Sequence, residues 1–362
     1  MPTTDINDAA HWLRLTLIPG LGDVTLRKLL TAFGTPEQVL AARHTELLNF
    51  AAADIATAII QGGNQDGAQI ALAWLGDEGN SIITLGDADY PQLLLQTADP
   101  PLLLYVKGRV DLLNRPCLAV VGSRNATAQG SENAADFART LSEAGITIVS
   151  GLALGIDAAA HRGGLAGSGS SIALVGTGLD VVYPARNKAL AHELASKGTL
   201  VSEYPLGTPP LASNFPRRNR LISGMSLGCL VVEAALQSGS LITARLANEQ
   251  GREVFALPGS IHSPLAKGCH VLIKQGAKLV DDANDILEEL KLAGRPSTLR
   301  AAPELAAEET LFLNQLGYEP CALDNLCVRT GLGADAVSGL LLELELRGLV
   351  ERLAGGRYQR LR

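Results

Sequence analysis

The densest group of basic side chains is the run 214–220, which reads Asn-Phe-Pro-Arg-Arg-Asn-Arg and contains no acidic residue. The guanidinium fork of arginine binds phosphate, asparagine can read the edges of bases, and an aromatic ring can stack on a base. Because the whole chain has a formal net charge of −7, a site for a polyanion has to be a local basic surface. The run therefore favours a phosphate-rich ligand, with a solvated loop or a cluster of structural salt bridges as the alternative.

Short turns rich in glycine and serine follow four of the apolar runs that we expect to be strands. Small residues let backbone N–H groups approach an anion closely, and open parallel sheets bind ligands beyond the carboxyl ends of their strands. Lys188, just after the segment 183–187, adds a positive charge. Together these features predict a phosphate groove at one edge of the sheet. The four turns are Gly122-Ser123-Arg124, Ser150-Gly151, Gly176-Thr177-Gly178 and Ser238-Gly239-Ser240.

Apolar runs alternate with helical segments from about residue 82 to residue 280. Continuous β-branched runs, separated by helices such as 131–143 and 189–197, are typical of a buried parallel sheet. The expected fold class is therefore α/β, with a doubly wound, Rossmann-like parallel-sheet core and right-handed crossovers. The predicted strands are 118–121, 146–149, 172–175, 200–201, 230–232, 254–257 and 278–280.

Helical patterns flank this α/β region on both sides. Residues 11–75 read as helices, and the turn 18–22 has the form of a helix-hairpin-helix turn or of a plain connection. Near the C-terminus, three short helices and a β-hairpin make a winged helix. Residues 310–362 carry six basic and six acidic residues, which favours packing or protein contact over duplex binding there. The expected units are a helical domain at 1–80, a Rossmann-like domain at 81–295, a linker at 296–307 and a winged helix at 308–362.

Motifs of common enzymes are absent from the sequence or stand in the wrong context. The chain has no Gly-Lys dipeptide for a phosphate-binding loop and no Gly-x-Gly-x-x-Gly for a dinucleotide. Residues 224–228 fit the hydrolase pattern Gly-x-Ser-x-Gly, but a strand follows them where a helix is required. Asp157 and His161, four residues apart, could be an acid/base pair, although a carboxylate in the first turn of a helix is also favoured electrostatically. We expect no catalytic residue.

Composition and cysteine spacing limit the cofactors and the compartment. The five cysteines form no Cys-x-x-Cys pair, so we expect no metal centre and no cofactor. The N-terminus has no apolar segment of the signal-peptide kind, and the least charged stretch, 223–244, fits a strand and a helix start better than a membrane span. A cytoplasmic protein without membrane association is expected.

Seven segments carry motifs that are specific in combination: 120–124, 150–157, 183–184, 202–205, 215–222, 238–244 and 258–259. In this order they resemble the DNA-processing protein A family (DprA, also called Smf) over nearly the whole chain. The resemblance implies an N-terminal helical domain similar to the sterile-alpha-motif fold, the Rossmann-like core and the winged helix.

The same resemblance implies a non-enzymatic protein that binds single-stranded DNA in natural transformation and recombination. Such proteins protect the strand and load RecA recombinase onto it, displacing single-stranded-DNA-binding protein, and they resemble homodimers that pair through the Rossmann-like domain. The implied DNA contacts are Ser123, Arg124, Lys188, Arg218, Asn219 and the turn Gly239–Ser240. With the other turns and the rest of the basic run, the predicted site comprises Gly122, Ser123, Arg124, Gly151, Asn187, Lys188, Arg217, Arg218, Asn219, Arg220, Gly239 and Ser240.

Two alternatives stay open at this point. The first is a nucleotide-processing enzyme similar to the phosphoribohydrolases, which share the core but show Pro-Gly-Gly-x-Gly-Thr-x-x-Glu after a strand. In this chain the corresponding place reads Ser238-Gly239-Ser240-Leu241-Ile242-Thr243, and the missing glutamate argues against cleavage of a glycosidic bond. The second is a duplex-binding regulator that acts through the winged helix.

Overall fold

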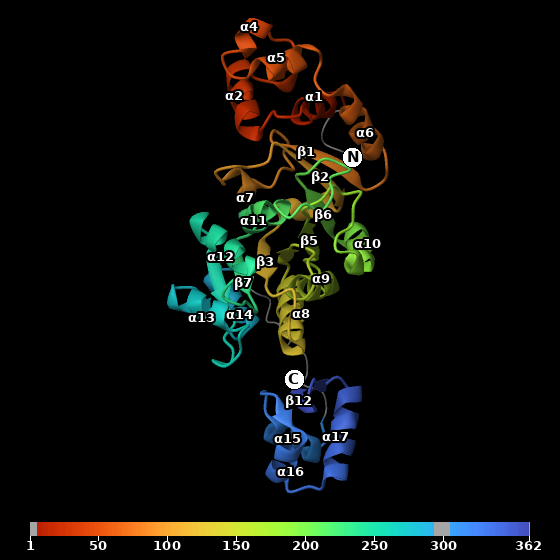
Figure 1. The fold of residues 1–362 in the computed structure, drawn as a ribbon, viewed down its shortest axis with the longest axis vertical. Coiled ribbons are helices and arrows are strands. Elements are labelled where there is room, and N and C mark those ends of the chain that lie inside the picture. The colour runs from red at the N-terminus through yellow and green to blue at the C-terminus, as the bar shows by residue number, and fades with distance from the viewer. Residues whose placement is uncertain (1–5, 293–304, 362) are drawn as a thin grey trace.

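The computed structural model describes residues 6–292 and 305–361 (Figure 1). At one end lie short helices, joined by tight turns, and their apolar sides pack together around Leu13, Leu26 and Ile59. The turn predicted at residues 18–22 connects the first two helices. The helices are α1 (Ile6–Thr16), α2 (Asp23–Phe33), α3 (Pro36–Leu40), α4 (His44–Leu47), α5 (Ala53–Ile60) and α6 (Gln65–Leu75).

A nine-stranded sheet forms the centre of the molecule, in the order β1-β2-β6-β5-β4-β3-β7-β8-β9. The seven strands from β3 to β9 run parallel, as the sequence predicted. Strands β1 and β2, which were not among the predicted strands, add an antiparallel edge to this parallel core. The strands are β1 (Asn80–Thr84), β2 (Leu103–Gly108), β3 (Cys117–Val121), β4 (Thr147–Ser150), β5 (Ser171–Leu174), β6 (Thr199–Ser202), β7 (Gly228–Val231), β8 (Glu253–Ala256) and β9 (Lys278–Leu279).

Helices cover both faces of the parallel part, because successive side chains of each buried strand point to opposite faces. On β3, Leu118 and Val120 face the layer of α8 (Ala128–Glu143), α9 (Ile156–Ala166) and α14 (Ala283–Glu289). Ala119 and Val121 face the layer of α11 (Asn214–Gly224), α12 (Gly239–Glu249) and α13 (Lys267–Lys274). The remaining helices of this region are α7 (Gln92–Leu95), α10 (Lys188–Lys197) and the 3-10 helices η1 (Val110–Asn114) and η2 (Ala185–Asn187).

The neighbouring strands β3 and β7 form the topological switch point of the sheet. From β3 the chain passes through α8 to β4, and from β7 it passes through α12 to β8, so the two connections leave in opposite directions. In sheets of this kind a crevice opens outside the carboxyl ends of these two strands. The sequence-predicted turns after Val121 and Val232 flank this crevice.

The N-terminal helices pack directly against the antiparallel edge of the sheet. One continuous apolar cluster contains Trp12 and Leu26 from the helices together with Leu103 and Tyr105 from β2. The rings of Trp74 and Tyr105 meet edge to face at a centroid distance of 5.8 Å. The helical unit and the sheet therefore share a packed core.

The C-terminal part is a winged helix, as predicted. Helices α15 (Ala307–Leu316), α16 (Leu323–Thr330) and α17 (Ala334–Leu346) pack around Phe312, Leu326 and Leu341. A small sheet in the order β10-β12-β11 completes it, with β10 (Cys321–Ala322), β11 (Val350–Leu353) and β12 (Arg357–Arg360). The predicted linker 296–307 falls mostly outside the described residues. Within residues 6–292 and 305–361, no helix has the length and apolar character needed to cross a membrane.

Candidate nucleic-acid interface

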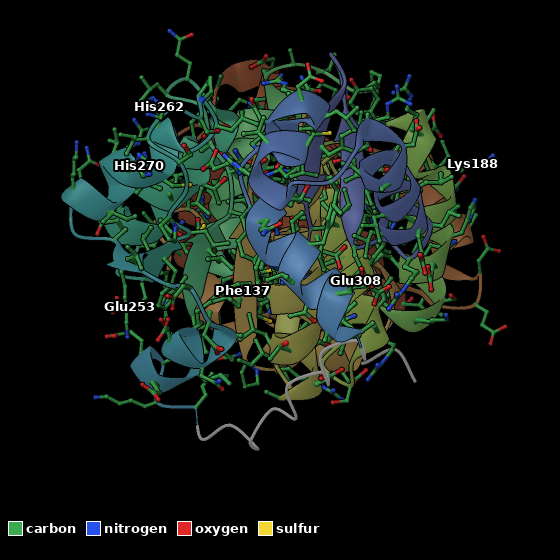
Figure 2. The ribbon with its side chains drawn as sticks, turned by 90° about the horizontal axis from the view of Figure 1, so that it is seen from below. Phe137, Lys188, Glu253, His262, His270 and Glu308 are labelled. Carbon is green, nitrogen blue, oxygen red and sulfur yellow. The ribbon has the colours of Figure 1, made fainter. Side chains whose placement is uncertain are left out.

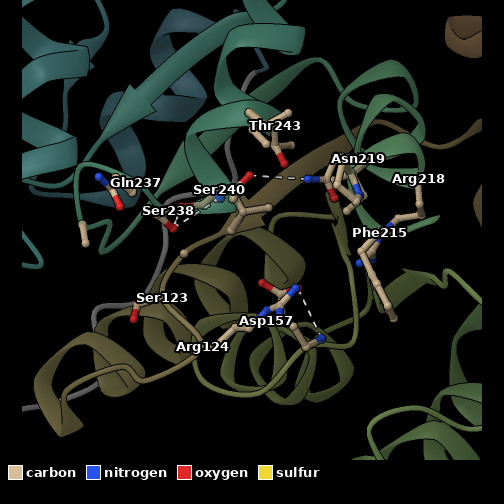
Figure 3. A pocket seen from close by; sticks show the side chains of 18 of the residues that line it. Ser123, Arg124, Asp157, Phe215, Arg218, Asn219, Gln237, Ser238, Ser240 and Thr243 are labelled. Atoms are coloured by element: carbon tan, nitrogen blue, oxygen red, sulfur yellow. Dashed lines mark hydrogen bonds between the residues drawn. The ribbon is translucent and has the colours of Figure 1, made fainter. Parts of the chain in front are cut away.

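A cavity of about 630 Å³ occupies the crevice at the switch point (Figure 3). We call it the crevice pocket. Three segments wall it: the turn after β3, the segment from β7 into α12, and one side of α11. Its lining residues are Val121, Gly122, Ser123, Arg124, Asn125, Ala153, Asp157, Tyr183, Pro210, Ala212, Phe215, Pro216, Arg218, Asn219, Ile222, Ala235, Gln237, Ser238, Gly239, Ser240, Ile242 and Thr243.

The turn after β3 is held from both sides by hydrogen bonds. The backbone N–H of Ser123 donates to the carbonyl of Glu233 at 2.8 Å, and the carbonyl of Ser123 accepts from the N–H of Ile156 at 3.1 Å. The Glu233 carboxylate also accepts from the N–H and the hydroxyl of Thr127, at 3.0 and 2.6 Å. This fixed turn presents the exposed side chain of Arg124 at the pocket.

The N-terminus of α12 forms the opposite wall. Ser238 caps the helix, since its hydroxyl accepts from the N–H of Ser240 at 3.3 Å, and the two hydroxyls lie 2.7 Å apart. The amide of Asn219, on α11, donates to the carbonyl of Gly239 at 3.4 Å and joins the two walls. Unpaired N–H groups and the helix dipole make such a helix start favourable for an anion.

Arg218 lies at the bottom of the pocket and is only 4% exposed. Its guanidinium donates to the carbonyl of Leu174 and is attracted by the buried carboxylate of Asp157. Burial lowers the pKa of Arg218 to about 10, so the guanidinium keeps its charge at neutral pH. A positive charge held in a poorly hydrated site interacts strongly with a phosphate that displaces water there.

Asp157 is held by backbone donors as well as by Arg218. Its carboxylate accepts from the N–H groups of Gly151 at 3.0 Å and Ala153 at 3.3 Å. Burial raises the pKa of Asp157, and the Arg218 guanidinium opposes that shift. Backbone donors hold this carboxylate in place, and its electrostatic attraction for the Arg218 guanidinium offsets part of the cost of burying that arginine.

Two aromatic rings and an arginine gather on one side of the pocket. The rings of Tyr183 and Phe215 are tilted to one another with centroids 5.4 Å apart. The guanidinium carbon of Arg124 lies 6.0 Å from the centroid of Phe215. Such a group offers stacking surfaces to a base beside a positive charge for its phosphate.

His161 does not line the crevice pocket, so the structure does not support an acid/base pair with Asp157 there. Its ring is fully buried behind the pocket, where Nε2 accepts from the N–H of Leu152 at 3.2 Å and Nδ1 lies 2.7 Å from the hydroxyl of Ser171. Leu152 has a φ of 58°, a conformation that is costly for a branched side chain. His161 therefore stabilises the turn that carries Gly151 and Ala153.

Burial lowers the pKa of His161 from 6.5 to about 3. Below pH 6.5 the unfolded chain binds a proton at this residue and the folded chain does not, so the stability that a neutral His161 supports is lost as the pH falls from 6.5 toward 3. We expect the free energy of unfolding to fall by up to about 1.4 kcal/mol for each unit by which the pH drops below 6.5. Denaturant unfolding of the wild type and of His161→Gln, at several pH values from 6.5 downward, measures the difference.

The exposed His192 supplies the control for this measurement. His192→Gln should keep the wild-type dependence of stability on pH, whereas His161→Gln should flatten it. Equal pH dependence in all three proteins would show that His161 is not the group responsible.

The structure brings part of the predicted site together in the crevice pocket. Gly151 and Asn187 support it from behind: a Cβ on Gly151 would lie 2.0 Å from Nη1 of Arg218, and the Asn187 amide donates to the carbonyls of Leu152 and Ala153 at 2.8 and 3.1 Å. Lys188 begins α10 and lies at the outer rim of the molecule, away from the lining (Figure 2). The predicted residues that line the pocket are Gly122, Ser123, Arg124, Arg218, Asn219, Gly239 and Ser240.

The structure divides the side chains of the basic run between two surfaces. Residues 214–224 form the helix α11, so consecutive arginines point in different directions. Arg218 and Asn219 face the pocket, whereas Arg217 and Arg220 face the N-terminal helices and pair there with acidic side chains. The predicted alternative, a structural salt-bridge cluster, therefore describes Arg217 and Arg220.

Several lining residues were not in the predicted site. Tyr183 and Phe215 belong to motifs that sequence analysis noted, and their aromatic character beside basic residues was an available signal. Gln237 and Thr243 carry no such signal, because only the packing of α12 beside α11 brings them to the pocket.

Comparisons with known proteins find similar sequences over most of the chain. A family model described as DNA recombination-mediator protein A matches residues 81–291, and one described as the DprA winged helix domain matches residues 296–356. Protein Smf of Escherichia coli is 47% identical over 300 residues, which cover 80% of each chain. DNA processing protein DprA of Streptococcus pneumoniae is 48% identical over 205 residues, which cover 57% of this chain and 72% of that protein.

Two solved structures are similar over long stretches. The X-ray structure of DNA processing protein A from Streptococcus pneumoniae matches with a TM-score of 0.69 and 36% identity, covering 80% of this chain and 99% of the other. The structure of DNA processing protein A from Helicobacter pylori, concerned with its mode of single-stranded DNA binding, matches with a TM-score of 0.53 and 32% identity. That match covers 58% of this chain and 95% of the other.

Proposed function

The chain belongs to the DNA recombination-mediator protein A family, and from this premise we propose that it binds single-stranded DNA in the crevice pocket. One observation carries the proposal: a helix N-terminus, a buried arginine, an exposed arginine and a pair of aromatic rings meet in one cavity. The arginines and the helix N-terminus can bind phosphates, and the aromatic rings can stack on a base. In a double helix the bases are stacked and paired, so a base of a single strand enters such a cavity more easily.

The chemistry of binding follows from the walls of the pocket. A strand phosphate sits at the N-terminus of α12, where the N–H groups around Gly239 and Ser240 and the charge of Arg218 stabilise it. Arg124 binds the next phosphate along the strand, and a base stacks beside Phe215. The proposed activity is binding, and it needs no bond cleavage.

The proposed cellular role extends this binding to partners. We propose that the protein protects single-stranded DNA in the cytoplasm and loads RecA recombinase onto it, displacing single-stranded-DNA-binding protein. We also propose a homodimer that pairs through the Rossmann-like domain at 81–295, between a helical domain at 1–80 and, after a linker at 296–307, a winged helix at 308–362. Two linked pockets would raise the avidity for a long strand without any new contact.

Fluorescence anisotropy of labelled oligothymidylate and of a matching duplex, at two salt concentrations, tests the proposal. The wild type should bind the single strand tightly and the duplex weakly, and its affinity should fall with salt as counterions are released. In Arg124→Ala the affinity should drop about tenfold, the value of one charge-assisted hydrogen bond, and the slope of log K against log salt should become shallower by about 0.7.

Arg162→Ala is the matched control, because Arg162 is also exposed but does not line the crevice pocket. It should bind as the wild type does. A folded wild type that does not bind single-stranded DNA would overturn the proposed function. Equal losses of affinity in Arg124→Ala and Arg162→Ala would show that Arg124 is not a specific contact of the strand.

A further inference from the structure

Helix α11 has a second side that the proposed function does not use. Phe215, Arg218 and Asn219 face the crevice pocket, at the spacing of one helical face. Arg217 and Arg220 stand on the other side, toward the N-terminal helices. Figure 1 shows α11 between those helices and α12. Because both sets of side chains belong to one helix, a displacement of α11 by its contacts with the N-terminal helices also displaces the residues that line the crevice pocket.

Alternating charges connect this second side to the N-terminal helices. Arg220 pairs with Glu203, which follows β6 directly, and lies 3.9 Å from the carboxylate of Asp99. Asp99 pairs in turn with Arg27 of α2, and Arg27 also donates to the carbonyl of Pro100 at 2.6 Å. The chain of pairs runs without a break from α2 to α11.

A parallel connection is made by Arg217. Its guanidinium lies 3.4 Å from the carboxylate of Asp23, at the start of α2, and 3.7 Å from that of Glu203. The negative charges of three acids equal the positive charges of three arginines in this group, which we call the α2–α11 charge network. Its members are Asp23, Arg27, Asp99, Glu203, Arg217 and Arg220.

The centre of the network is withdrawn from water. The side chain of Glu203 is 4% exposed and that of Arg220 is 14% exposed. In such surroundings an ion pair is little screened, and loss of one partner leaves a charge that the fold has to accommodate by moving. The network is thus a stiff connection and differs from an exposed pair of surface charges.

The position of α11 sets the width of the crevice pocket. The carbonyl of Arg220 accepts from the Gln250 amide at 3.1 Å, directly after α12, while Asn219 contacts Gly239 at the start of α12. Both ends of α12 are therefore tied to α11. A shift of α11 therefore strains these two contacts and disturbs the arrangement of Arg218 and the Ser238–Ser240 turn, which hold the strand in the proposed function.

We propose that the α2–α11 charge network makes the N-terminal helical unit a determinant of single-strand affinity, with Glu203 and Arg220 as positioning residues that never touch the strand. The inference rests on the proposed function of the crevice pocket. By linkage it has a reciprocal form: a strand bound in the pocket strengthens the attachment of α2 to the rest of the protein.

Arg27 is the residue to change, because it belongs to α2 and does not line the crevice pocket. In Arg27→Ala the Kd for oligothymidylate should rise at least about fivefold, the lower range of coupling between sites. The slope of log K against log salt should stay that of the wild type, since no phosphate contact is lost. Arg27→Lys keeps the charge and should recover most of the affinity.

Arg139→Ala is the matched control. Arg139 pairs with Asp136 on α8 and its side chain is 29% exposed, against 24% for Arg27. It should leave the affinity unchanged. An Arg27→Ala protein that binds like this control would overturn the inference, and so would a shallower salt slope, which would mean that Arg27 contacts the strand itself.

Hydrogen exchange provides the second readout and uses the intact wild type. Saturating oligothymidylate should slow amide exchange in α2, and this protection should be lost in Arg27→Ala. Unchanged exchange in α2 of a wild type that does bind the strand refutes the inference while leaving the proposed function intact. A wild type that binds no strand refutes the proposed function first, and the inference falls with it.

Discussion

Arg218→Met is expected to weaken single-strand binding about a hundredfold and to destabilise the folded protein at the same time. A charge-assisted hydrogen bond contributes up to about 3 kcal/mol, which corresponds to that loss of affinity. Arg218 is also the counter-ion of Asp157, and both side chains are buried. Removing one partner of a buried pair costs about 3–5 kcal/mol, because an uncompensated charge stays behind.

A second substitution separates the two effects. Asp157→Asn removes the buried charge and keeps an oxygen that can accept from the N–H groups of Gly151 and Ala153. In Arg218→Met/Asp157→Asn the free energy of unfolding should return most of the way to the wild-type value, whereas the affinity for the strand should stay low. Denaturant unfolding and anisotropy on the same preparations measure both quantities.

The double variant also decides what Arg218 does. If affinity returned together with stability, the single substitution would have acted only through unfolding, and Arg218 would not be a phosphate ligand. If stability did not return, Asp157 would not be the group that requires this arginine.

Gly155→Ala is the change with the next largest expected effect. Gly155 precedes α9 with φ +74° and ψ −125°, a region that only glycine adopts easily. A Cβ there would lie 2.3 Å from the carbonyl oxygen of Ser123 and 2.7 Å from that of Arg124. We expect a loss of at least about 1–3 kcal/mol in the free energy of unfolding, with displacement of the turn that carries Arg124 and correspondingly weaker strand binding.

Gly145→Ala separates backbone strain from displacement of the turn. Gly145 also has a positive φ, +91°, but a Cβ there meets nothing within 4 Å. Its replacement should cost stability through strain and leave strand affinity as in the wild type. Full affinity in a folded Gly155→Ala protein would contradict the role of this glycine in placing Ser123 and Arg124.

The helical and strand segments were largely predictable, because their signals are local. The short apolar runs indicated the parallel strands, and three short helices followed by a β-hairpin indicated the winged helix. The edge strands β1 and β2 were missed. The partner that joins β2 to the parallel strands is β6, which follows β2 by some ninety residues and runs antiparallel to it, and β1 pairs only with β2. Pairing over such a distance leaves little trace in the segments themselves.

For the site, sequence by itself determined which chemical groups are present. Glycine turns after strands, an aromatic residue next to arginines and the order of the motifs were enough to predict a phosphate-binding edge and the family. The reason is that the carboxyl ends of parallel strands always meet at one edge of the sheet, so turns that are far apart in the chain come together.

Only the tertiary structure decided which arginines serve that edge. The sequence does not distinguish the three arginines of the basic run, Arg217, Arg218 and Arg220. In the helix α11, however, each residue is rotated by about a hundred degrees from the one before it, so these side chains point in different directions. Arg218 therefore points into the crevice pocket beside Asp157, while Arg220 points to Glu203 and the N-terminal helices. Glu203 lies 17 residues before Arg220 in the chain, and Asp157 lies 61 residues before Arg218. Only the packing of the folded chain brings each acid close to its arginine.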